Sequence, residues 1–134
     1  MRPRYLLDTN ICIYLLKGER TSIIDRVSKC SVGEAVMSSI TYAELMFGVA
    51  VSSDPGRESK AVARLIDAVP AMPFGAKEAQ AYAGIRKATP DRKADALDKL
   101  IAAHAAALGV VLITNNEGDF SRYPGIKVEN WARA

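Results

Sequence analysis

Tyr5-Leu6-Leu7-Asp8-Thr9-Asn10 is a short apolar run that ends abruptly in an acid, a hydroxyl and an amide. A run of this length predicts a buried strand, and the apolar stretch from Ile11 to Leu16 predicts the helix that follows it. Asp8 then stands at the carboxyl end of the strand. Ligands bind at that edge in open α/β sheets, but Asp or Thr at such a turn can equally cap the next helix. Both interpretations of Asp8 stay open on this stretch alone.

Apolar runs alternate with helical patterns along the rest of the chain. Strands are predicted at 36–38, at 110–114 and near 126–128, with an edge strand or a loop at 71–74. Helices are predicted at 21–28 with Thr21 as a cap, and at 57–68, 76–88 and 97–108. The helix that starts at Ser39 is apolar on more than one side, so we expect it to be well buried. This alternation predicts an α/β sandwich with a mostly parallel sheet.

The composition indicates one globular domain spanning residues 1–134. The chain is 49% hydrophobic and 25% charged, which argues against disorder. It contains no membrane-length apolar run and no features of a signal peptide, so we expect a cytoplasmic protein. Cys12 and Cys30 form neither a metal-binding pattern nor a disulfide framework, and we interpret both as structural. The formal net charge of +3 permits a polyanionic partner without demonstrating one.

Four acids fall outside loop-like or solvent-facing contexts. Asp8 ends the first strand, and Glu44 lies inside the most apolar helix. Asp98 opens a helix, and Asp119 follows the clearest strand. In a parallel sheet these acids can converge at one edge. Each has a simpler explanation: Thr41 and Glu44 match a capping box, Asp98 can oppose a helix dipole, and Asp119 can be a turn residue.

A converging acid cluster would need a cation. Two carboxylates about 4 Å apart repel by roughly 4 kcal/mol at an effective dielectric of about 20, so several cannot all stay ionised unaided. Oxygen ligands with few protein groups suit Mg²⁺ or Mn²⁺, and no His or Cys cluster suggests zinc. Such ions activate water for attack on phosphate esters. The residues therefore favour metal-dependent phosphoester hydrolysis.

Four stretches, in order along the chain, carry a resemblance to a known family. They are Leu6-Leu7-Asp8-Thr9-Asn10, the run from Ser38 to Leu45, the run from Asp98 to Ala105, and Thr114-Asn115-Asn116-x-x-Asp119-Phe120 with the later Pro124-Gly125 and Glu129-Asn130-Trp131. Together they resemble the PIN-domain ribonucleases, specifically the VapC toxins of bacterial toxin–antitoxin pairs. The resemblance implies a PIN-like α/β/α sandwich whose acidic pocket binds Mg²⁺ or Mn²⁺ and cuts RNA.

The resemblance also implies roles for the acids. By position, Asp8 and Asp98 match the family's principal metal ligands, Glu44 its helix glutamate and Asp119 its fourth acid. Many members carry an aspartate where this chain has Asn116, so the fourth-acid role is shared or weakened here.

The loop before Asp98 also departs from the family. That loop usually reads Gly-Pro-hydrophobic-Asp, whereas this chain has Lys93-Ala94-Asp95-Ala96-Leu97, which makes Asp95 a rival to Asp98. The spacing to Ile101 and His104 favours Asp98.

Several other side chains have two interpretations. Residues that could hydrogen-bond the carboxylates or a water, or simply cap a turn, are Thr9, Asn10, Thr114, Asn115 and Asn116. His104 is rotated roughly 240° from Asp98 around the helix, which favours packing over catalysis. Basic residues that could contact phosphate, or form solvated helix faces, are Arg57, Lys60, Arg64, Arg86, Lys87, Arg92 and Lys93. Tyr14, Met46 and Phe47 could pack in the core or form an apolar groove for an antitoxin helix.

The leading hypothesis is a toxin endoribonuclease that cleaves structured RNA such as tRNA. The resemblance implies a cognate VapB-like antitoxin, a homodimer and a toxin–antitoxin hetero-oligomer. One alternative is a phosphatase with a phosphorylated strand-end aspartate, which usually needs a second acid where Asn10 stands. Another is a non-enzymatic module that receives phosphate on Asp8 or binds RNA without cutting it.

Overall fold

The computed structural model describes residues 2–89 and 96–132. The strands in this range are β1 (Tyr5–Leu7), β2 (Ala35–Ser38), β3 (Ala71–Met72), β4 (Val111–Ile113) and β5 (Lys127–Glu129). The helices are α1 (Thr9–Lys17), α2 (Thr21–Ser28), α3 (Ser39–Ala50), α4 (Pro55–Ala68), α5 (Ala76–Ala88), α6 (Ala96–Leu108) and α7 (Glu117–Phe120). None of these helices is long and apolar enough to cross a membrane.

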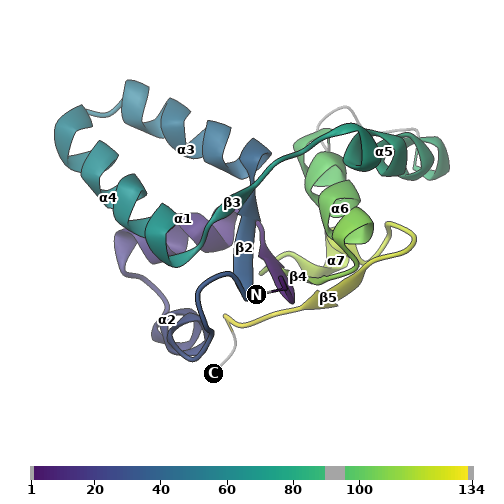
Figure 1. Cartoon of the computed structure of the whole chain (residues 1–134), viewed down its shortest axis with the longest axis horizontal. Coiled ribbons are helices and arrows are strands. Elements are labelled where there is room, and N and C mark those ends of the chain that lie inside the picture. Colours follow the sequence, from purple (N-terminus) through teal and green to yellow (C-terminus); the bar gives the residue numbers. More distant parts are fainter. Residues whose placement is uncertain (1, 90–95, 133–134) are drawn as a thin grey trace.

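The strands form one sheet in the order β3-β2-β1-β4-β5, and every neighbouring pair is parallel. Helices α1 to α4 lie on one side of the sheet, and α5 and α6 lie on the other (Figure 1). The predicted α/β/α sandwich is confirmed, as is the edge position of β3. The central strand β1 is the one that Asp8 follows.

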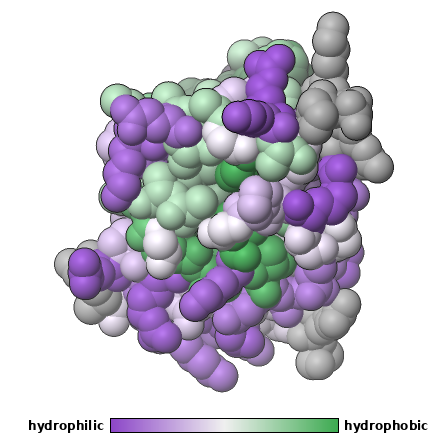
Figure 2. Space-filling view, turned by 90° about the vertical axis from the view of Figure 1, so that its right-hand side faces the viewer, coloured by the Kyte–Doolittle hydropathy of each residue, from purple (hydrophilic) through white to green (hydrophobic). Residues whose placement is uncertain are grey.

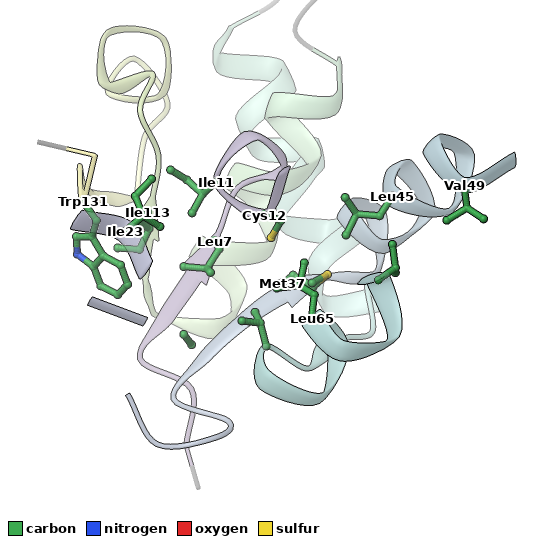
Figure 3. Packing of buried hydrophobic residues seen from close by; sticks show 13 residues of the cluster. Leu7, Ile11, Cys12, Ile23, Met37, Leu45, Val49, Leu65, Ile113 and Trp131 are labelled. Carbon is green, nitrogen blue, oxygen red and sulfur yellow. The ribbon is translucent and has the colours of Figure 1, made fainter. Parts of the chain in front are cut away.

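Side chains of the central strands alternate between two cores, as the period of two in a strand requires. Leu7, Met37 and Ile113 pack beneath α1 to α4, together with Trp131 from the end of the described chain (Figure 3). Their neighbours Leu6, Val36 and Leu112 pack beneath α5 and α6. Burial on both faces explains why β1, β2 and β4 are continuously apolar in the sequence.

The expectation that α3 is well buried is wrong. Its buried residues are Thr41, Leu45 and Val49, which form one face. On the other sides, Phe47 is 64% exposed and Tyr42, Met46 and Val51 are also exposed. The helix packs mainly against α1 and α4, which cover only one side of it. Helix α3 therefore presents an apolar surface to solvent.

Two predicted caps are also wrong. Thr21 is the first residue of α2, and its N-cap is Arg20, which has a left-handed backbone with φ 62° and ψ 80°. Helix α3 starts after Ser38, whose hydroxyl accepts a hydrogen bond from the Ile40 N–H, so Thr41 and Glu44 form no capping box. Glu44 thus lies beyond the first turn of its helix and does not cap it.

The opposite side of the molecule has a mixed surface. Figure 2 looks onto the α5 and α6 side, where green apolar areas are interrupted and bordered by purple hydrophilic side chains. Helix α5 has exposed alanines, Ala79 and Ala83 among them.

Candidate active site

The site lies at β1, the strand at which the order of strands in the sheet reverses. Strands β2 and β3 extend the sheet on one side of β1, and β4 and β5 extend it on the other. A crevice therefore opens at the carboxyl ends of β1 and β4, the usual ligand position in open α/β sheets. Asp8 directly follows β1, and Thr114 directly follows β4. Two of the residues singled out in the sequence thus meet at this point.

Asp8 is held by a hydrogen bond to each carboxylate oxygen. Its Oδ1 accepts from the Ile11 N–H at 2.9 Å, so Asp8 does cap α1. Its Oδ2 accepts from the Thr114 hydroxyl at 2.5 Å. Thr114 in turn accepts from the Asn116 N–H at 2.9 Å. The cap and the functional interpretation of Asp8 are therefore compatible, because each oxygen keeps further lone pairs.

Three of the four acids line one pocket of about 280 Å³. Asp8 comes from the end of β1, Glu44 from α3 and Asp98 from the first turn of α6. Thr9 and Asn10 also line the pocket. Its apolar wall is formed by Ile13, Leu97, Ile101 and Phe120. Acids that are far apart in the sequence share this cavity because α1, α3 and α6 all begin at the same edge of the sheet.

Asp119 is not among the residues that line this pocket. It lies on the short helix α7, and its Oδ2 accepts from the Asn116 Nδ2 at 2.8 Å. Asn116 is itself bonded to Thr114 through its backbone N–H. Asp119 is thus linked to Asp8 through two intervening residues. Asp95, Arg92 and Lys93 lie outside the described residues.

Burial raises the pKa of Asp8 to about 6, and the nearby charge of Asp98 adds to the rise. The hydrogen bonds from Thr114 and Ile11 act in the opposite direction. Asp8 is only 4% exposed, so its charge is poorly solvated. A cation beside this carboxylate would offset the cost of burying its charge and the repulsion between Asp8 and Asp98.

Protein side chains alone do not complete a metal site in the described part of the chain. Within residues 2–89 and 96–132, no group of three or more His, Cys, Asp or Glu side chains is close enough to hold an ion. Mg²⁺ commonly takes water molecules among its ligands where few protein groups are at hand.

Hydroxyl groups connect the helices around the pocket. The Thr9 and Thr41 hydroxyls lie 3.0 Å apart and join α1 to α3. Asn115, exposed after β4, accepts from the Asn130 Nδ2 at 3.1 Å and is not among the residues that line the acid pocket. Thr9 lines the acid pocket, and no sequence pattern pointed to its hydrogen-bond partner, Thr41.

His104 is fully buried and is not among the residues that line the acid pocket. Its Nδ1 lies 2.8 Å from the Ser38 Oγ, and its ring meets Phe74 edge-on. Burial lowers the pKa of His104, against a smaller opposing effect of Glu78. Its Nε2 has no hydrogen-bond partner among the described residues. The packing interpretation of His104 is the one that fits this environment.

The remaining candidates lie on the surface or are half-buried. Arg57, Lys60 and Arg64 are exposed along α4. Tyr14 is half-buried, and the guanidinium of Arg20 lies 4.8 Å from the centre of its ring. Sequence patterns did not point to Arg20, because the periodicity of apolar residues does not indicate which residue adopts a left-handed backbone conformation.

Residues 5–126 match the PIN domain family, and the chain belongs to that family. The tRNA(fMet)-specific endonuclease VapC of Shigella flexneri is 30% identical over 131 residues, which are 96% of this chain and 98% of the relative. The enzyme of the same name from Salmonella typhimurium is 33% identical over the same shares.

Solved structures agree with these relatives. The DNA-bound VapBC from Salmonella typhimurium superposes with a TM-score of 0.85 at 33% identity, over 96% of this chain and 98% of the other. VapBC2 from Rickettsia felis, bound to a fragment of promoter DNA, gives a TM-score of 0.84 at 30% identity, over 95% and 98%. Within the PIN-domain family, the chain is one of the VapC ribonucleases.

Proposed function

We propose that the chain is a Mg²⁺- or Mn²⁺-dependent endoribonuclease, the toxin of a VapBC-like pair, that cuts structured RNA such as tRNA. The pocket shared by Asp8, Glu44 and Asp98 is the observation that carries this proposal. Two relatives that span nearly the whole chain are named for tRNA(fMet) cleavage, which supports a tRNA substrate.

Asp8 and Asp98 are the proposed metal ligands. When bound, the ion would lower the pKa of a water molecule and offset charge on the phosphate. Hydrogen bonds from the Thr114 hydroxyl and the Ile11 N–H hold the Asp8 carboxylate in one orientation. Asp8 and Asp98 line the same pocket. Glu44 would accept the proton of the attacking water. Asp119 would act through Asn116 rather than as a direct ligand.

The reaction is hydrolysis of a phosphodiester. A water oxygen bonds to phosphorus, the bond from phosphorus to one sugar oxygen breaks, and that oxygen gains a proton. One RNA end keeps the phosphate and the other becomes a hydroxyl. The phosphatase alternative is less well supported, because Asn10 stands where such enzymes usually carry a second acid.

A cleavage assay tests the proposal. Purified protein is incubated with labelled tRNA, in EDTA and then with added Mn²⁺. We expect cleavage only with the metal, and its loss in both Asp8→Asn and Asp98→Asn. Asp67→Asn, at an exposed acid of α4, is the matched control and should cleave normally. Undiminished metal-dependent cleavage by both pocket variants would refute the assignment.

The partner we propose is a VapB-like antitoxin, with the toxin forming a homodimer inside the larger complex. The similar structures named VapBC support this partner class. The exposed apolar side chains of α3, including Met46 and Phe47, offer a surface for such an interaction. Co-expression with a small DNA-binding protein encoded beside this chain should yield a stable complex that inhibits cleavage.

A further inference from the structure

A second cavity lies beside the acid pocket. It has a volume of about 360 Å³, and the side chains that matter here are Arg20, Asn115, Asn116, Glu117 and Asn130. None of these five lines the acid pocket. We call this space the Arg20 cavity. It is polar, and it brings together the loop after β4, the residue before α2 and the segment after β5.

The Arg20 cavity is separated from Asp8 by one residue. Thr114 donates to Asp8 Oδ2, and the next contact is the Asn116 N–H, which donates to Thr114 Oγ1 at 2.9 Å. Asn116 then forms part of the cavity wall. Two hydrogen bonds therefore connect the carboxylate of Asp8 to the wall of the Arg20 cavity.

Arg20 provides the positive charge. Its guanidinium lies over the Tyr14 ring at 4.8 Å, which holds the side chain in place. Among residues 2–89 and 96–132, Arg20 forms no ion pair. A planar guanidinium binds phosphate oxygens through two parallel hydrogen bonds. Its positive φ of 62° is uncommon for a residue other than glycine.

The amides complete a wall suited to an anion. Asn130 Nδ2 donates to Asn115 Oδ1 at 3.1 Å and to Glu117 Oε1 at 3.2 Å. Asn130 Oδ1 accepts from the Ala132 N–H at 2.8 Å, which holds that amide in one orientation. With its oxygen engaged, Asn115 keeps its two amide N–H groups as donors. Glu117 adds a carboxylate, opposite in sign to Arg20, to the same wall.

We propose that the Arg20 cavity binds an RNA phosphate that flanks the cleaved bond, with Arg20 as the main contact. The inference rests on the proposed ribonuclease function, because it concerns the same substrate. Arg20 then acts in binding and positioning, while the acids act on the scissile phosphate.

Binding of labelled tRNA by the full chain tests this role separately from cleavage. The measurement uses Asp8→Asn protein, with and without Arg20→Gln, over a range of salt concentrations. We expect Arg20→Gln to weaken binding about 10- to 100-fold and to reduce the salt slope by about one. Arg20→Lys should recover part of the affinity, because it restores charge but not the planar fork. Lys29→Ala, at the other end of α2, is the charge-matched control.

Arg20→Gly guards against a trivial loss of folding. Glycine adopts positive φ readily, so this variant removes the guanidinium and relieves the backbone. It should melt no lower than the parent protein and still bind RNA as weakly as Arg20→Gln. In otherwise wild-type protein, both variants should raise KM and leave kcat within about threefold.

Parental affinity and salt slope in both Arg20 variants would overturn the inference even where the wild-type protein cleaves RNA. Failure of the wild-type protein to cleave would instead count against the proposed function, and the binding measurements would still decide the role of Arg20.

Discussion

The Ser38 hydroxyl and His104 Nδ1 lie 2.8 Å apart and join the start of α3 to the interior of α6. These two helices carry Glu44 and Asp98. Because Ser38 also caps α3 through the Ile40 N–H, this buried pair helps to set where α3 begins relative to α6. The relative placement of two pocket acids therefore depends on a contact outside the pocket.

His104 should make the protein less stable in mild acid. Burial lowers its pKa in the folded state below the 6.5 of the exposed side chain. Below pH 6.5 the unfolded chain therefore binds a proton that the folded chain does not. The free energy of unfolding should fall as pH decreases toward the folded pKa, by at most about 1.4 kcal/mol per pH unit from this group. Urea unfolding of wild type and of His104→Gln at pH 7.5 and 5.5 checks this. The titration of Asp8 changes the stability of the two proteins equally, so it cancels in the comparison. An identical pH dependence in the two proteins would contradict the prediction.

Asp8→Asn should stabilise the metal-free protein near neutral pH. The pKa of Asp8 is about 6 in the folded state and 3.8 when exposed, so folding disfavours the ionised form above pH 6. The asparagine carries no charge, its Oδ1 can still accept from the Ile11 N–H, and its Nδ2 would donate to the Thr114 hydroxyl, which reverses that hydrogen bond. We expect a gain of up to about 3 kcal/mol at pH 7.5 that disappears as pH falls to 4. Chemical denaturation in EDTA measures it, and equal stability at both pH values would argue against a buried charge at Asp8.

Thr114→Val should slow RNA cleavage by about 10- to 100-fold, the usual effect of losing a hydrogen bond to a metal-binding side chain. Valine matches the shape of threonine but cannot donate to Asp8 or accept from Asn116. Thr114→Ser keeps the hydroxyl and should retain activity within a few-fold. Initial rates at saturating Mn²⁺ distinguish the two, and equal rates for valine and serine would show that the hydroxyl is dispensable.

Phe47→Glu should weaken antitoxin binding without unfolding the toxin. The ring is 64% exposed on α3, so its replacement should change the free energy of unfolding by about 0.5 kcal/mol or less. Gln80→Glu, exposed on α5, serves as the control for added charge. Titration calorimetry with the purified antitoxin checks the effect. Unchanged affinity in Phe47→Glu would place the interface elsewhere.

Local sequence was sufficient for the strands, for the helices other than α7, and for the edge that Asp8 and Thr114 share. Strands β1 and β4 are buried on both faces, so they appear as continuous apolar runs, and Asp8 ends one of them. The periodicity of apolar residues did not indicate which side of α3 faces solvent, because apolar residues occur on every side of the helix. The Thr114–Asp8 and Ser38–His104 contacts depend on the order of strands and helices in space, which no local pattern contains.

The position of β1 at the centre of the sheet has a consequence for synthesis. Its two neighbours are made much later: β2 begins at Ala35 and β4 at Val111. Asp8 is made long before Asp98 and Thr114, which lie 90 and 106 residues further along the chain. A nascent chain therefore cannot assemble the acid pocket until Asp98 and Thr114 have been made, and a chain released before residue 98 carries no such pocket.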